Sequence, residues 1–149
     1  MKRLQTVFLV LFTYCVIVSR ALASSDIDSA IKTLAASFSP KIKAGEKVAI
    51  IEFSNLQGEI TQLGRLLAEE LITGMMIEAE ARFEVIERRL LMRVLEEHDL
   101  VLKDIMEPNA IETLGKVLSL DVIITGTTTD LGNTLRVNGR VISVSYTHL

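Results

Sequence analysis

A histidine flanked by two acids is the first grouping in this chain that could do chemistry. Glu97-His98-Asp99 has the side chains of general acid and base catalysis. Adjacent residues on a helix point in different directions, however, so these three side chains do not form a proton relay. A solvated helix end is the favoured interpretation, and His98 alone cannot make a metal site.

Two glycines lie where nucleotide-binding proteins carry a phosphate loop, between an apolar run and a helical pattern. That loop needs two glycines separated by four residues and followed by lysine and a hydroxyl residue, because backbone amides wrap the phosphates and the lysine reaches them. Gly58 and Gly64 have the wrong spacing, and Arg65-Leu66 follows them. They are therefore assigned to a turn and to close packing. The chain is predicted to have no catalytic residue, cofactor or metal. The enzymatic alternative is a nucleotide-binding or hydrolytic α/β protein.

Glu87-Arg88-Arg89 lies where a second apolar run gives way to a helix. The carboxyl ends of strands in α/β folds are the edge at which ligands tend to bind. Arg88 could bind a carboxylate or phosphate of a partner, or it could pair with Glu52 or Glu87 and fix the strand end, which is the favoured interpretation. Together with the loop after the first strand, this edge is the candidate contact region for a partner. Its residues are Ser54, Asn55, Gly58, Arg88 and Arg89.

These groups depend on a short apolar stretch, Val48-Ala49-Ile50-Ile51-Glu52-Phe53, around which the chain is organised. So short a run, apolar on both faces, is typical of a strand covered by helices on each side of a sheet. Val85-Ile86 and Val122-Ile123-Ile124 repeat the pattern, and a helical pattern separates each pair of runs. This order predicts an α/β fold with a mostly parallel three-layer sheet and helices on both faces.

The last strand-like runs predict a different pairing. Val122 to Thr129 is rich in β-branched residues, and Gly132-Asn133 separates it from an alternating run at 135–141, which is a hairpin signal. The sheet should therefore end in an antiparallel β-hairpin with one solvated face. Helices are expected over 24–38, 63–76, 90–98 and from 108 onward. The methionines assigned to the core are Met75, Met76, Met92 and Met106.

The chain begins with the form of a secretory signal peptide. Basic residues precede the apolar run Val7 to Val18, and Ala21-Leu22-Ala23 supplies a cleavage site. A membrane-spanning helix needs ~20 apolar residues. This run is shorter and is interrupted by polar residues, so a cleaved signal helix over 1–23 is favoured over a retained anchor. Ala21 and Ala23 are the small residues of the site, and after cleavage behind Ala23 no membrane-spanning segment is expected.

Charge and cysteine content restrict the partners. The whole chain has a net charge of −3, and removal of the leader takes away three of its basic residues. An acidic chain with no tryptophan and no basic cluster argues against nucleic acid and against an anionic membrane surface. Cys15, the single cysteine, lies in the leader, so the mature domain at 24–143 would have neither a disulfide nor a thiolate site.

The last residues are expected to be foreign to the gene. Val144-Ser145-Tyr146-Thr147-His148-Leu149 is what one reading frame of the mosaic-end adapter of transposase-based library preparation encodes. The segment 144–149 is therefore interpreted as a non-native tail, with the true carboxyl terminus missing. Resequencing the locus tests this, and a native stop codon after Leu149 would contradict it. No function is assigned to Tyr146 or His148.

The order of these pieces, more than any single motif, resembles the FlgO/CsgG-type superfamily. This superfamily groups the flagellar protein FlgO, the curli secretion protein CsgG, lipoprotein activators of peptidoglycan synthases and the amino-terminal domain of TolB. The resemblance covers residues 45–143. It rests on the apolar stretch at 48–53 and on Leu67-Ala68-Glu69-Glu70-Leu71, Phe83-Glu84-Val85-Ile86-Glu87-Arg88, Leu95-Glu96-Glu97, Leu114-Gly115-Lys116, Asp121-Val122-Ile123-Ile124-Thr125-Gly126 and Leu135-Arg136-Val137-Asn138-Gly139-Arg140-Val141-Ile142.

The resemblance implies a non-enzymatic assembly or binding domain of the bacterial cell envelope, in the periplasm or at the inner face of the outer membrane. Flagellar or surface-structure assembly is the expected role, and activation of a peptidoglycan synthase is the alternative. Envelope proteins are the expected partners, and a homo-oligomer is left open. CsgG carries a long membrane-spanning hairpin where this chain has only Asp130 to Thr134, so a secretion pore is not expected.

Overall fold

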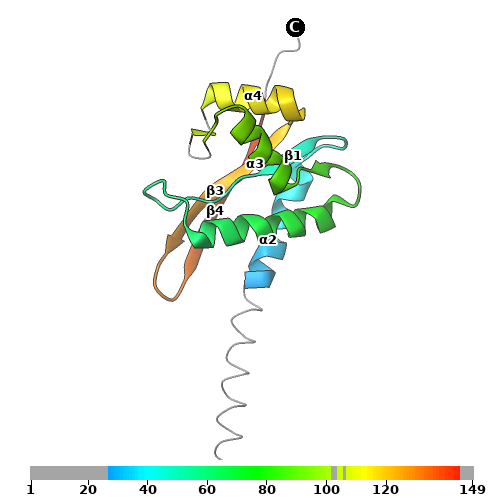
Figure 1. Ribbon diagram of the computed structural model, residues 1–149. Coiled ribbons are helices and arrows are strands. Elements are labelled where there is room, and N and C mark those ends of the chain that lie inside the picture. The colour runs from blue at the N-terminus through cyan, green and yellow to red at the C-terminus, as the bar shows by residue number, and fades with distance from the viewer. Residues whose placement is uncertain (1–26, 102–103, 106, 145–149) are drawn as a thin grey trace, which may run out of the picture.

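The computed structural model describes residues 27–101, 104–105 and 107–144 (Figure 1). The expected leader with Ala21 and Ala23 lies outside the described residues, as do residues 145–149 of the expected tail and Met106. None of the helices in the described part of the chain is long and apolar enough to cross a membrane.

Four strands form one sheet. Its strands are β1 (Lys47–Ile50), β2 (Glu84–Val85), β3 (Val122–Asp130) and β4 (Leu135–Ser143), in the order β2-β1-β3-β4. β1 lies parallel to both of its neighbours, whereas β3 and β4 are antiparallel and pair along their whole length. The prediction of a mostly parallel sheet that ends in an antiparallel hairpin is confirmed.

Helices cover both faces of the sheet (Figure 1). Residues 27–38 are helical and continue into the 3₁₀ turn η1 (Ser39–Lys41), where Pro40 ends the helix. This helix packs with α2 (Gln62–Ala79) on one face. The opposite face carries α3 (Arg88–Glu97) and α4 (Pro108–Leu118). The three-layer arrangement is the one predicted, and exposed His98 caps the end of α3, as expected for a solvated helix end.

The alternation of β1 explains why its sequence is apolar without interruption. Val48 and Ile50 belong to the core beneath helix 27–38 and α2, whereas Ala49 and Ile51 belong to the core beneath α3 and α4. Successive side chains of a strand point to opposite faces, so a central strand between two helical layers must be apolar at every position.

Phe53 is fully buried just after β1 and fixes the start of α2. Its carbonyl oxygen would lie 1.8 Å from a Cβ placed on Gly64, so the first turn of the helix can approach the strand only because that residue is glycine. The hydroxyl of Thr61 caps the same turn by accepting a hydrogen bond from the amide of Gly64. Gly58, with φ of +82°, makes the turn before it. The assignment of these glycines to a turn and to close packing is confirmed.

Candidate functional site

Arg88 joins three elements at the carboxyl edge of the sheet. It is the first residue of α3, and its Nη2 lies 2.5 Å from Oε1 of Glu52, which follows β1. Its Nη1 donates a hydrogen bond of 2.7 Å to Oε1 of Glu69 on α2. The predicted structural pair with Glu52 is therefore present, whereas Glu87 makes no ion pair among the described residues. Glu69 was not predicted as a partner.

The two carboxylates that face Arg88 differ in their surroundings. The side chain of Glu52 is 3% exposed and that of Glu69 is 51% exposed, with Arg88 between them at 26%. Oε1 of Glu52 is buried and lies within ion-pair distance of the guanidinium, but no N–H of a neighbouring group is aligned to donate to it. The charge of Glu52 is thus balanced by Arg88 alone within the described residues, which makes Arg88 part of the scaffold.

A groove of about 520 Å³ opens beside this ion-pair network, between α2 and α3. Arg89 lies on its rim, is exposed and has no ion-pair partner in the described part of the chain. Met76 on α2 is 48% exposed, which corrects its assignment to the core, because it faces the groove instead of the sheet. The residues that line the groove are Glu69, Ile72, Met76, Glu87, Arg88, Arg89 and Met92.

The loop after β1 is held in one conformation by its own polar side chains. Oδ1 of Asn55 accepts hydrogen bonds from the amides of Gln57 and Glu59 at 3.0 and 2.8 Å, and its Nδ2 donates to the carboxylate of Glu59. Ser54 ties the loop to β3, because its amide donates to Gly126 and its carbonyl accepts from the amide of Thr128. The roles of Ser54 and Asn55 that the structure shows are therefore structural.

A second groove, of about 480 Å³, lies between this loop and the end of β3. Leu56 projects from the loop with 68% of its surface exposed. Sequence reasoning missed this residue, although an apolar side chain in an otherwise polar loop, Ser54 to Gly58, was a readable signal. The residues that line the groove are Asn55, Leu56, Gln57, Thr61, Leu63, Thr128, Thr129 and Asp130.

The candidate contact residues thus fall into two neighbouring groups. Arg88 and Arg89 line the groove between α2 and α3, and Asn55 lines the groove at the loop. Glu52 and Ser54 follow β1 between them, as the carboxyl-edge rule predicts. Two grooves that combine charged side chains with exposed apolar ones are suited to recognising a protein surface. Across 27–101, 104–105 and 107–144, no three His, Cys, Asp or Glu side chains gather to hold a metal ion.

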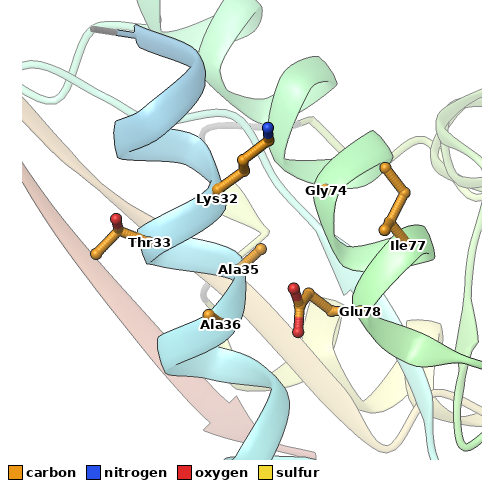
Figure 2. A pocket seen from close by; sticks show the side chains of 7 residues that line it. All are labelled: Lys32, Thr33, Ala35, Ala36, Gly74, Ile77 and Glu78. Atoms are coloured by element: carbon orange, nitrogen blue, oxygen red, sulfur yellow. The ribbon is translucent and has the colours of Figure 1, made fainter.

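A third groove, of about 390 Å³, lies away from this edge, between helix 27–38 and α2 (Figure 2). Ala35 and Gly74 form its floor, and a Cβ on Gly74 would lie 3.3 Å from the Cβ of Ala35. The side chains of Lys32 and Glu78 reach into the space between the helices (Figure 2). The small residues account for the close approach of the two helices, so this groove is a consequence of packing.

Comparison with known proteins decides the family. A model of the FlgO protein family matches residues 28–148, which is most of the chain. The chain belongs to the FlgO family. This FlgO-family domain also has the fold of the LpoB C-terminal domain from Salmonella enterica, with a TM-score of 0.62 and 12% identity over 80% of this chain and 88% of that one. For the LpoB C-terminal domain from Escherichia coli the TM-score is 0.63 and the identity 10%, with the same coverage. No curated protein matches the sequence.

Proposed function

We propose that this FlgO-family domain is a non-catalytic binding component of the bacterial cell envelope that serves the assembly of the flagellum or of another surface structure. The observation that carries the proposal is the family match over residues 28–148. The arrangement of the carboxyl edge agrees with it, because Arg88 is engaged by two carboxylates and the neighbouring grooves offer apolar and charged rims.

The contact would be made by the two grooves of the carboxyl edge. Arg89 and Leu56 are the side chains to test, because both are exposed and neither takes part in an ion pair of the described structure. Arginine is among the residues that contribute most of the binding free energy in protein interfaces, and an exposed apolar side chain such as Leu56 supplies surface that gains free energy when a partner buries it. Ser54, Asn55 and Gly58 would act by holding Leu56 in place.

Motility of the source bacterium tests the flagellar role. A deletion strain should swim poorly and be rescued by the wild-type gene, whereas Arg89→Glu and Leu56→Asp should fail to rescue at normal protein levels. Lys43→Glu is the matched control, because Lys43 is exposed before β1, at the opposite end of the sheet, and undergoes the same change of charge. Normal motility of the deletion strain would contradict the flagellar role.

Activation of a peptidoglycan synthase is the second candidate function. The two LpoB C-terminal domains share the fold of this chain. The superfamily that the sequence resembles also includes lipoprotein activators of these synthases. The purified domain should then raise the glycan polymerisation rate of a synthase from the same cell, and Arg89→Glu should lower that stimulation. An unchanged rate at saturating domain concentration would exclude the activator role.

The non-catalytic function and the location of the protein in the cell each have a separate test. A nucleotide-induced thermal shift that saturates would favour the nucleotide-binding or hydrolytic alternative, because a ligand that binds the native state raises the unfolding temperature. Export to the periplasm, with cleavage after Ala23, predicts that the mature chain starts at Ser24 in the periplasmic or outer-membrane fraction. Amino-terminal sequencing of the fractionated protein checks it.

A further inference from the structure

One of the two edge strands of the sheet, β4, is unusually long for an edge strand. β4 has nine residues, and none of them is buried. β2, at the opposite edge, is only two residues long. Within the described chain β4 pairs with β3 alone, so its other side carries unpaired backbone groups. An exposed edge of this kind is a template for one more strand unless the protein blocks it.

The hydrogen bonds at the two ends of the β3–β4 ladder show which amides face outward. The amide of Val144 donates to Asp121, and the amide of Leu131 donates to Thr134. Hydrogen-bonded pairs alternate along an antiparallel ladder, so the even-numbered residues of β4 bond to β3 and the odd-numbered residues point away from it. No described residue bonds to the outward backbone groups of Leu135, Val137, Gly139, Val141 and Ser143.

The two faces of β4 differ in chemistry. Val137 and Val141 pack against the core beneath helix 27–38. The other face presents Arg136, Asn138 and Arg140, which are exposed and lie opposite threonines of β3. No carboxylate of the described residues lies within ion-pair distance of either arginine. This face is therefore an unneutralised cationic row on a chain that is acidic as a whole.

These charges oppose the pairing of β4 with a second copy. In the antiparallel register centred on Asn138, Arg136 of one copy would lie directly opposite Arg140 of the other. In the register of greatest overlap, centred on Gly139, Arg140 of each copy would be a diagonal neighbour of both arginines of the other. Like charges at opposed positions destabilise a strand pair, and edge charges commonly prevent self-association. The same two positions favour a strand that carries carboxylates, because guanidinium and carboxylate groups form short, charge-assisted hydrogen bonds.

We propose that β4 accepts an extended acidic segment of a partner protein as a fifth strand of the sheet. The segment has two carboxylate side chains four positions apart, which face Arg136 and Arg140, and apolar side chains at the alternating positions. Its backbone bonds to the outward amides of Val137, Gly139 and Val141. None of these β4 residues lines a groove of the carboxyl edge, although Arg136 pairs with Thr129, which lines one of them. The proposal does not depend on the function proposed above.

Binding of a designed peptide to the purified protein tests the proposal. The probe has about seven residues, within the usual length of a strand, with valine alternating with glutamate, threonine and glutamate. Its control carries lysine in place of both glutamates. Two cross-strand charge pairs should make the glutamate peptide bind about tenfold more tightly than the lysine peptide. The combined variant Arg136→Glu with Arg140→Glu should reverse this preference.

Hydrogen exchange distinguishes strand addition from simple charge attraction. The glutamate peptide should slow exchange at the amides of Val137, Gly139 and Val141, which face the free edge. Val137→Pro should weaken peptide binding, because proline removes an outward N–H and is tolerated on an edge strand. The exchange measurement uses the wild-type protein, so it decides the matter even where this variant is unstable.

Three results would overturn the proposal. Equal binding of the two peptides would show that the arginine row does not select acidic segments. Binding of the glutamate peptide without slower exchange at the three outward amides would exclude a fifth strand. Self-association of the wild-type protein that is lost in Val137→Pro, seen by analytical ultracentrifugation, would identify the occupant as a second copy.

Discussion

Arg88→Ala would leave the buried carboxylate of Glu52 without the cation that faces it. Glu52 is 5% exposed, and Nη2 of Arg88 lies 2.5 Å from its Oε1. Removing one partner of a buried pair costs about 3–5 kcal/mol, mainly because the other charge stays buried and uncompensated. The guanidinium is itself 26% exposed, and solvent screening lowers the cost, so we expect a loss of about 3 kcal/mol.

The loss is measured by urea unfolding and by thermal unfolding. In a domain of this size 1 kcal/mol corresponds to about 4 °C, so the unfolding temperature should fall by about 12 °C. Arg89→Ala is the matched control, because Arg89 is adjacent, exposed and unpaired within the described structure. The control should stay within about 0.5 kcal/mol of the wild type.

A double-mutant cycle identifies the cause. Combining Arg88→Ala with Glu52→Gln removes the orphaned charge, so the double variant should recover about 1–2 kcal/mol relative to the sum of the single losses. Glu69→Ala should cost about 1 kcal/mol or less, because half of that side chain is exposed. Strictly additive losses for Arg88 and Glu52, or a loss in Arg88→Ala no larger than in Arg89→Ala, would refute the ion-pair explanation.

Two further predictions concern packing and charge elsewhere in the domain. Gly64→Ala should destabilise the domain by about 3 kcal/mol in urea unfolding, since its Cβ would collide with the carbonyl of Phe53. The control Gly74→Ala should change stability by about 1 kcal/mol or less. Equal losses of stability in the two variants would contradict the close contact at Gly64. The side-chain hydrogen bond from Lys116, and then its charge, lower the pKa of Glu112, so stability from this pair is present above the unfolded pKa and is lost as pH falls through the folded pKa. Lys116→Met should raise the pKa of Glu112 toward its ordinary value in an NMR titration, and an unchanged midpoint would contradict the assignment.

Much of the fold followed from local patterns. The three apolar runs with helical patterns between them predicted the order of the elements, and the glycine and asparagine before Leu135 predicted the terminal hairpin. The observed bounds differ from the expected ones mainly at the ends. β1 stops at Ile50 although the apolar run continues to Phe53, and β2 has only two residues. β3 still bonds to Ile51 and Ser54, but its register shifts by one residue between the pair Ile50–Ile124 and the pair Ser54–Thr127, which ends the regular ladder. A shift of register depends on the neighbouring strand, so the apolar run itself does not reveal it.

The candidate site was predictable only in part. Its place at the carboxyl ends of the strands and the pair between Arg88 and Glu52 could be inferred, because a charge at the end of a buried strand needs a nearby counter-charge. Glu69 could not be singled out among the acidic residues of α2, since that choice depends on how the helix lies across the sheet. Met76 was assigned to the core for the same reason.

The amino-acid sequence by itself determined which segments are strands and helices and which of their faces are apolar, because periodicity is a property of neighbouring residues. Only the tertiary structure decided the strand order β2-β1-β3-β4, the contact of Arg88 with both carboxylates, and the position of β4 as an edge that pairs with β3 alone among the described residues. These features arise between residues far apart in the chain, whose meeting is set by the packing of whole elements against one another and not by any pattern within one of them.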